Sequence, residues 1–249
     1  MRRVLVVGVG AGDPEYMTVA AIRALDEADV IFEPSRPTAD LTAAREDLVR
    51  RFAPSPPRTV VVHEPRRDRR APDYERTVGD WRAQRAESWE AAIAAELAPD
   101  GCGAFLVWGD PSLYDSTIAV LDAVRERGRV AFEYPVIPGV SSVHALTARH
   151  RIALNRIAGA VLITTGRRLA EQGLPDGVDD VVVMLDGDCA FRHVVGESLH
   201  IYWGAYLGTQ DELLVSGPLA EVAGEIERVR SEARERKGWI MDTYLLRRP

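Results

Sequence analysis

Short apolar runs alternate with stretches of helical spacing through the first half of the chain. The run Val4–Val9 is continuous and ends among glycines, and Val19, Ile22 and Leu25 then recur at helical spacing over residues 18–28. The same alternation predicts further strands at 29–32, 59–62, 103–108 and 130–137, and helices at 41–52, 115–127 and, as one helix or two, 74–97. Strands that alternate with helices predict a mainly parallel sheet covered on both faces.

The pattern changes after Gly139. Strand-like runs then follow one another with fewer and shorter helical stretches between them, at 160–164, 181–185, 199–203, 212–216 and 239–245. The long helix expected at 219–236 is dense in Glu and Arg at spacings of three and four, which is typical of a solvated outer face. We therefore predict two α/β domains, residues 1–139 with a mainly parallel sheet and residues 140–249 with a mixed sheet.

Composition narrows the classes of partner. The chain has 249 residues, of which 46% are hydrophobic, and its 31 Lys and Arg against 38 Asp and Glu give a net charge of −7. This balance disfavours nucleic acid as a partner. The two cysteines, Cys102 and Cys189, fit a reducing compartment. No apolar run approaches the length of a membrane span or of a signal sequence, so we expect a cytoplasmic protein with no membrane partner.

The first glycine loop superficially matches a dinucleotide-binding fingerprint. Gly8, Gly10 and Gly12 follow a strand, and Glu33 ends the next one. However, Asp13 occupies the position of the third fingerprint glycine, and the proline after it lacks the N–H that would receive a pyrophosphate. We interpret this loop instead as a turn that lets a flat ligand approach the backbone, although Asp13 can equally cap the next helix.

Two further loops follow buried strands. Trp108–Pro111 ends one strand, and Pro138–Ser142 ends the next and offers two hydroxyl groups at a helix start. The carboxyl ends of parallel strands are where open sheets usually bind ligands. Either loop alone could be an ordinary turn, but the pair in this order is far more specific.

The remaining candidate chemistry is sparse. The histidines are dispersed outside any serine-centred elbow, and Cys189 and His193 make a lone pair of metal-like spacing, so we expect no metal. The segment Arg66–Arg70 holds four arginines beside prolines. It is either a solvated loop or an electrostatic attractor for a polyanionic small molecule.

Together the three loops resemble those of the tetrapyrrole methylase family. That family pairs a first loop like Gly8–Pro14 with a Gly-Asp-Pro loop and a Pro-Gly-x-Ser-Ser turn, and the likeness runs through nearly the whole chain. The resemblance implies two α/β domains, S-adenosylmethionine in the cleft between them, a tetrapyrrole substrate over the first loop, and a homodimer.

Carried over position by position, the resemblance also implies a set of cofactor-binding residues. The chain departs from the family at Leu185-Asp186, where Met-Gly is usual, and at Arg236–Trp239, where the family has a Pro-rich entry to the last strand. The implied residues are Trp108, Gly109, Asp110, Leu113, Tyr114, Ser141, Ser142, Leu185, Ala205, Trp239, Ile240 and Met241.

The segments 106–117, 184–191 and 238–244 resemble one deacetylating branch of the family. This implies methylation of precorrin-5 with water and S-adenosylmethionine to give precorrin-6A, acetate and S-adenosylhomocysteine, in the route to the corrin ring of cobalamin. Deacylation needs a base for water, and among Asp13, Tyr16, Tyr114 and Asp115 we favour Asp13, the one carboxylate of the first loop. The alternatives are a tetrapyrrole methylase that releases no acetate and a non-catalytic tetrapyrrole carrier.

Overall fold

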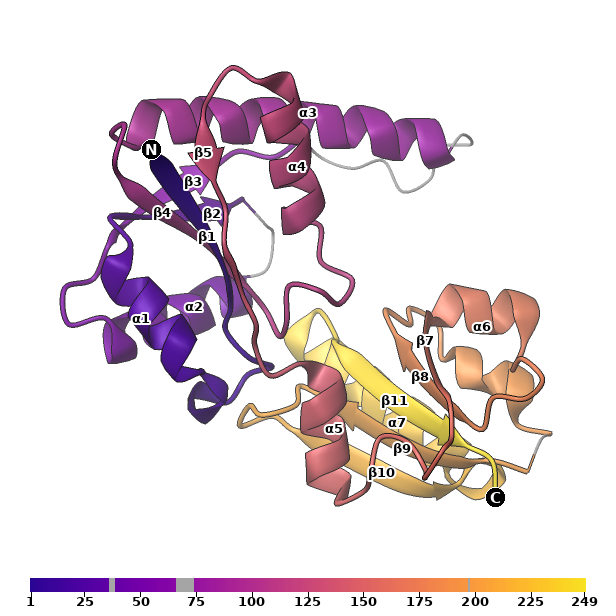
Figure 1. The fold of residues 1–249 in the computed structure, drawn as a ribbon. Coiled ribbons are helices and arrows are strands. Elements are labelled where there is room, and N and C mark those ends of the chain that lie inside the picture. The colour runs from indigo at the N-terminus through magenta and orange to yellow at the C-terminus, as the bar shows by residue number, and fades with distance from the viewer. Residues whose placement is uncertain (36–38, 66–73, 197) are drawn as a thin grey trace. The chain divides into compact units, whose positions relative to one another are not determined.

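The computed structural model describes residues 1–35, 39–65, 74–196 and 198–249, with the backbone alone for 39–40 and 74–80 (Figure 1). The described chain divides into two compact units. The first comprises residues 1–10 and 14–140, and the second comprises residues 11–13 and 141–249.

A parallel sheet forms the centre of the first unit. Its strands lie in the order β3-β2-β4-β1-β5, β6 also pairs with β1, and every pair is parallel. The predicted parallel sheet is therefore confirmed. The elements are β1 (Arg2–Gly8), a 3-10 turn (Pro14–Tyr16), α1 (Val19–Glu27), β2 (Val30–Pro34), α2 (Ala39–Phe52), β3 (Arg58–Val62), α3 (Tyr74–Glu96), β4 (Cys102–Val107), α4 (Thr117–Arg127), β5 (Phe132–Glu133) and β6 (Val136–Ile137).

From Val4 onward, strand β1 has no polar side chain, because both of its faces are covered. Val4 and Val6 belong to the core beneath α3 and α4, whereas Leu5 and Val7 belong to the core beneath α1 and α2. Successive side chains of a strand point to opposite faces, so one apolar run serves both layers. Figure 1 shows α1 and α2 on one side of this sheet and α3 and α4 on the other.

A mixed sheet forms the centre of the second unit, as predicted. Its order is β10-β9-β11-β8-β7, in which β7 and β8 are parallel and the other pairs are antiparallel. The elements are α5 (Ser142–His150), β7 (Val161–Thr165), α6 (Gly166–Gln172), β8 (Asp180–Met184), a 3-10 turn (Ala190–Val194), β9 (His200–Ala205), β10 (Leu213–Pro218), α7 (Leu219–Lys237) and β11 (Asp242–Arg247).

Helices cover both faces of the second sheet. Trp203 and Ala205 of β9 share a core with Leu219 and Ile226 of α7. A Cβ on the intervening Gly204 would instead lie 2.9 Å from Cδ1 of Leu146 in α5. Because neighbouring residues of a strand face opposite sides, α5 covers the face opposite α7.

Three predicted boundaries were wrong. The strand expected at 130–137 is two short pieces, because Pro135 lacks the N–H that a continuous ladder needs, although its carbonyl accepts from Val6 N at 3.0 Å. The helix expected from residue 115 begins at Thr117, whose N–H donates to the Asp115 carboxylate at 2.6 Å. The last strand begins at Asp242 rather than at Trp239.

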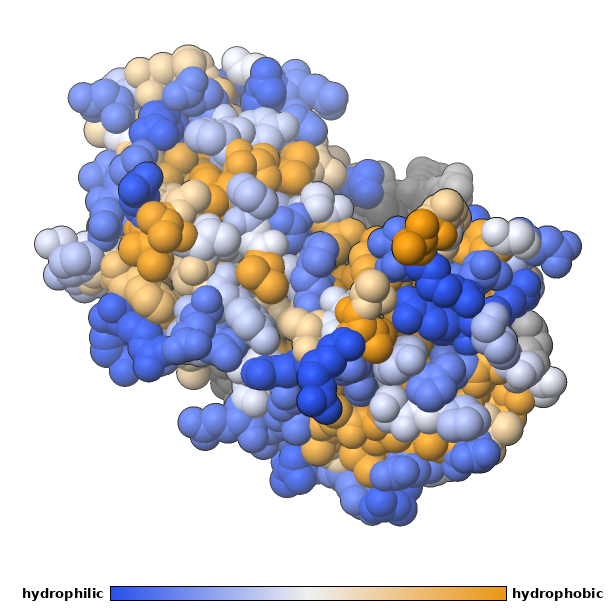
Figure 2. Space-filling model, turned by 60° about the horizontal axis from the view of Figure 1, so that its bottom comes forward, coloured by the Kyte–Doolittle hydropathy of each residue, from blue (hydrophilic) through white to orange (hydrophobic). Residues whose placement is uncertain are grey.

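The surface mixes polar and apolar groups. On the face shown in Figure 2, hydrophobic residues lie among hydrophilic ones. The large hydrophobic side chains exposed on the described chain include Tyr114, at 46%, and Leu185, at 65%. No helix among the described residues combines the length and apolar character needed to cross a membrane.

Two histidines make the second unit sensitive to acid. His150 lies 3.0 Å from the carbonyl oxygen of Trp203, and His200 packs on the ring of Tyr202. Burial lowers the pKa of His150 below its ordinary value of 6.5, and burial followed by the positive charge of Arg247 lowers the pKa of His200. Their neutral forms contribute stability that is complete above pH 6.5 and is lost as the pH falls through the lowered values.

We therefore expect His150→Gln, which keeps a donor for Trp203 but does not titrate, to lose less stability than the wild type on acidification. Urea midpoints at about pH 7.5 and about pH 5.5 measure the difference. The exposed His193 supplies the control, since His193→Gln should follow the wild type. Equal losses in His150→Gln and wild type would contradict the assignment.

Candidate functional site

Three glycines bring three backbone segments into contact at the carboxyl edge of the first sheet. Gly8 ends β1, Gly109 follows β4, and Gly139 follows β6. A Cβ on Gly139 would lie 2.2 Å from the carbonyl oxygen of Gly109, and one on Gly8 would lie 2.6 Å from the nitrogen of Gly139. No side chain fits between these segments, so glycine is required where they cross. We call Gly8, Gly109 and Gly139 the glycine crossing.

Hydrogen bonds fasten the first loop to the second. Gly10 N donates to Gly109 O at 3.2 Å, and Gly109 N donates to Gly10 O at 2.8 Å. The first loop and the Gly-Asp-Pro loop thus form one continuous backbone surface, as their positions after neighbouring parallel strands predicted.

The carboxylate of Asp110 fastens the second loop to the third. One oxygen accepts from Gly139 N at 2.9 Å, and the other accepts from the backbone N of Ser112 at 2.8 Å and from its hydroxyl. Asp110 therefore stabilises the glycine crossing. Its implied role in cofactor binding stays a prediction.

The neighbouring predicted residues carry two unusual features. Trp108 has a buried indole N–H with no hydrogen-bond partner in the first unit or elsewhere in the described chain. Tyr114 has a φ of 51° and a half-exposed side chain. Such a backbone conformation costs on the order of 1–3 kcal/mol for a non-glycine residue and is typical of functional loops. Leu113 is partly buried beside Tyr114.

The two serines of the third loop belong to the second unit and have different environments. Ser141 is buried and caps α5, because its hydroxyl accepts from His144 N and lies 2.8 Å from His144 Nδ1. Ser142 is partly buried, and its hydroxyl lies 3.3 Å from that of Thr243. Ser141 thus has a structural role in helix capping, whereas Ser142 faces the start of β11.

Within the second unit, the other predicted residues gather at one edge of the sheet. Thr243 pairs with both Met184 and Gly204, so Leu185, Ala205 and Met241 lie at neighbouring strand ends. The carbonyl of Met241 accepts from Tyr206 N at 3.0 Å, and the hydroxyl of Tyr206 donates to Trp239 O at 2.6 Å. Ile240 and Trp239 pack against the core of this unit. The structure therefore brings these separated segments together, and their role in binding stays a prediction.

A buried polar network beneath Leu185 was missed by the sequence analysis. Asp186 accepts from the Tyr244 hydroxyl at 2.7 Å and from Ala190 N at 2.7 Å, and Arg230 donates to Asp186 O at 2.6 Å and to Asp242 at 2.9 Å. Burial, and after it the charge of Asp186, raise the pKa of Tyr244 far above its usual value, so the hydroxyl stays a donor.

One signal in the sequence could have revealed this network. Arg230 falls on the stripe of α7 whose other members, Leu219, Ala223, Ile226 and Ala233, are apolar and buried. An arginine at a core position of an amphipathic helix needs an acidic partner, and the network supplies Asp242. Leu185, which has a φ of 53°, directly precedes Asp186 and so belongs to the segment that this network holds.

Asp13 lies in the second unit beside Arg149. Its carboxylate is 3.8 Å from the Arg149 guanidinium, which donates to Glu212 at 3.0 Å, and Glu212 accepts from Gly208 N at 2.7 Å. Gly12 packs closely on the same segment, because a Cβ at this position would lie only 2.5 Å from Leu207 O. Its φ of 139° also favours glycine, so no other residue fits there. Asp13 is thus a partly exposed carboxylate held in place by its neighbours.

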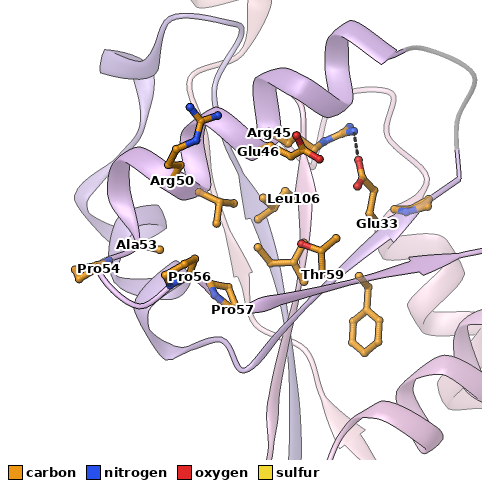
Figure 3. Close-up of a pocket in the computed structure, with 14 residues that line it drawn as sticks. Glu33, Arg45, Glu46, Arg50, Ala53, Pro54, Pro56, Pro57, Thr59 and Leu106 are labelled. Atoms are coloured by element: carbon orange, nitrogen blue, oxygen red, sulfur yellow. Dashed lines mark ion pairs between the residues drawn. The ribbon is translucent and has the colours of Figure 1, made fainter.

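A cavity of about 320 Å³ lies between α2 and strands β2 and β3 (Figure 3). Prolines and aliphatic side chains form its walls. Charged side chains also line it: Arg45 lies 3.9 Å from Glu33, and Arg50 pairs with Asp47 outside the cavity at 3.3 Å. None of the predicted site residues lines it.

The predictions for the arginine segment and for the absence of a metal stay predictions. The arginines of the segment 66–70 lie outside the described residues. Within residues 1–35, 39–65, 74–196 and 198–249, no group of three or more His, Cys, Asp or Glu side chains could hold a metal ion.

The chain belongs to the tetrapyrrole (corrin/porphyrin) methylases, whose family model matches residues 3–223. The class that the three loops indicated is thereby confirmed. Among curated relatives, a precorrin-6A synthase [deacetylating] from Sinorhizobium sp. is 49% identical over 251 aligned residues, which cover 100% of this chain and 96% of the relative. A precorrin-2 C(20)-methyltransferase from Sinorhizobium sp. is 33% identical over 57% of this chain and 55% of that protein.

Solved structures agree with this assignment. A cobalamin synthesis related protein (CobF) from Corynebacterium diphtheriae matches with a TM-score of 0.86 and 39% identity, over 99% of this chain and 98% of that one. A uroporphyrin-III C-methyltransferase from Thermus thermophilus, complexed with S-adenosylhomocysteine, shares the fold with a TM-score of 0.58 at 21% identity, over 98% and 96% of the two chains.

The glycine crossing yields a direct stability test. Gly139→Ala places a methyl group 2.2 Å from Gly109 O, so the backbone segments must separate. We expect a loss of at least about 1–3 kcal/mol, the usual cost of overpacking, measured by urea unfolding. The control is Gly224→Ala in α7, where a Cβ meets nothing within 4 Å and alanine favours the helix. A Gly139→Ala variant as stable as wild type would show that the crossing is not tight.

Proposed function

We infer that this chain is an S-adenosylmethionine-dependent C-methyltransferase of cobalamin biosynthesis. It converts precorrin-5, water and S-adenosylmethionine to precorrin-6A, acetate and S-adenosylhomocysteine. The observation that carries this inference is the 49% identity to precorrin-6A synthase [deacetylating] across 100% of the chain and 96% of the relative. The likeness at 39% identity to a cobalamin synthesis related protein supports the same pathway.

The residues of the first unit fit a methyl donor. The glycine crossing offers backbone without side chains. The buried indole N–H of Trp108 is a hydrogen-bond donor that has no acceptor among the described residues. We propose that Trp108, Gly109, Asp110, Leu113 and Tyr114 hold S-adenosylmethionine on this side. When bound, this cofactor supplies a methyl group on a positively charged sulfur.

The second unit carries exposed and strand-end groups of its own that suit a methyl donor. We propose that Leu185 contributes an apolar wall, and that Ser141, Ser142, Ala205, Trp239, Ile240 and Met241 also contact the donor, the buried Ser141 through its backbone. Methyl transfer needs proximity and alignment above all, which can be worth roughly 7–11 kcal/mol. The glycine crossing and the network beneath Leu185 are suited to that task, since a part-buried hydrogen bond holds the first and buried hydrogen bonds hold the second.

Removal of the acetyl group would require activated water. We propose that Asp13 accepts a proton from this water as it attacks the acetyl carbon. The carboxylate is partly exposed, so water can reach it, and Arg149 fixes its position. Loss of the acetyl group leaves its bonding electrons on the ring, and the ring carbon is then the nucleophile that takes the methyl group.

The decisive experiment is incubation of the purified protein with precorrin-5 and S-adenosylmethionine. We expect precorrin-6A, with acetate and S-adenosylhomocysteine released in equal amounts, measured by mass spectrometry and an enzymatic acetate assay. Methylation without acetate would identify another tetrapyrrole methylase. Binding of precorrin-5 without heat on titration with S-adenosylhomocysteine would identify a tetrapyrrole carrier.

Replacing the proposed base should separate chemistry from cofactor binding. We expect Asp13→Asn to slow acetate release by about 10²–10⁴-fold, the usual contribution of a general base, with an unchanged calorimetric affinity for S-adenosylhomocysteine. Glu15→Gln makes the same carboxylate-to-amide change at an exposed position two residues away and should leave the rate unchanged. Full acetate release by Asp13→Asn would refute the role of Asp13.

We further propose that the protein is a cytoplasmic homodimer and that its small-molecule partner is a tetrapyrrole substrate. We propose that it binds no nucleic acid, membrane or metal. The arginines of 66–70 would attract the carboxylates of that substrate.

A further inference from the structure

Arg85 of α3 is a buried arginine that joins two segments of the first unit. Its side chain is 1% exposed. Nε and Nη2 lie 2.7 Å and 2.6 Å from one carboxylate oxygen of Glu64, which follows β3, while Nη1 donates to the Ser116 hydroxyl at 2.7 Å. A single guanidinium therefore connects the end of β3 to the end of the loop that begins at Gly109.

Two tryptophans hold this guanidinium in place. Its central carbon lies 4.5 Å from the ring centroid of Trp81 and 5.0 Å from that of Trp89. The Trp89 indole N–H also donates to Glu64 at 3.0 Å, and its ring stacks on Phe105 of β4 at 4.0 Å. The guanidinium contacts two aromatic rings and also donates to two acceptors. Arginine can make this arrangement because its cation is planar with several donors, whereas the lysine ammonium cannot.

The loop that receives this contact needs anchors. Its Tyr114 has a left-handed backbone, which is unfavourable unless the surroundings enforce it. At the start of the loop, Asp110 binds Gly139 N; at its end, Asp115 caps α4. Ser116 directly precedes α4, yet its hydroxyl does not cap the helix and is instead met by Arg85.

We propose that Arg85, acting through Ser116, is a positioning residue that fixes the loop 109–116 for binding of the methyl donor. A buried ion pair gains little net stability over apolar packing, so the conformation it specifies is the better reason for its presence. This inference rests on the proposed function, because the loop is a donor site only in a methyltransferase.

The test compares variants that cut the link at different points. Ser116→Ala keeps the Arg85–Glu64 pair and removes only the contact to the loop, whereas Ser116→Thr keeps a hydroxyl. By calorimetry with S-adenosylhomocysteine, we expect Ser116→Ala and Arg85→Lys to raise Kd about 3- to 10-fold, the worth of one hydrogen bond. Ser116→Thr should restore the wild-type affinity. Amides of 112–117 should exchange faster with deuterium in Ser116→Ala, while those of 120–127 stay unchanged.

The matched control is an ion pair that joins α3 directly to α4 and does not contact the loop. Arg127 of α4 donates to Glu90 of α3 at 3.0 Å, at the end of α4 remote from the loop. Arg127→Lys should therefore leave Kd within about twofold of wild type, even if the melting temperature falls.

The outcomes separate the two levels of inference. Wild-type affinity in both Ser116→Ala and Arg85→Lys, or equal weakening in Arg127→Lys, would overturn the positioning role. If Arg85→Lys fails to fold, Ser116→Ala decides alone. A wild-type protein that binds no S-adenosylhomocysteine would overturn the proposed function, and the positioning role with it.

Discussion

The close approach of three backbone segments at Gly8, Gly109 and Gly139 constrains the carboxyl edge of the first sheet. With a Cβ on Gly139 only 2.2 Å from a carbonyl oxygen, the points where these segments cross have no space for side chains. This contact fixes where β1, β4 and β6 end relative to one another. At the crossing itself, the loops that follow these strands therefore consist of peptide groups without side chains.

Two polar residues around this crossing have a structural task in addition to the one that their chemistry first suggests. Asp110 and Ser141 are of the types that bind a ribose or an amine, yet in the structure Asp110 joins two loops and Ser141 caps a helix. A carboxylate has about four acceptor sites, so Asp110, which accepts three hydrogen bonds from the two loops, mainly positions the backbone.

The sequence predicted the two sheets and the three loops well, because each depends on local signals. Apolar runs such as Val4–Val9 and glycines at strand ends are legible in a single sequence. The buried networks were not predicted, since they join residues far apart in the chain. Arg85 meets Glu64 and Ser116, and Arg230 meets Asp186 and Asp242, at separations that no periodicity records. The interruption at Pro135 could have been predicted from the sequence, because a proline cannot donate to a continuous ladder.

The second unit is discontinuous in sequence, because residues 11–13 pack with residues 141–249 and not with their neighbours in the chain. The chain therefore passes between the units at three places, after residues 10, 13 and 140. A fragment cut at residue 141 would lack the tripeptide that packs on Leu207 and that carries the partner of Arg149. Neither unit is a module that recombination could exchange at a single breakpoint, so the two halves are expected to be inherited together.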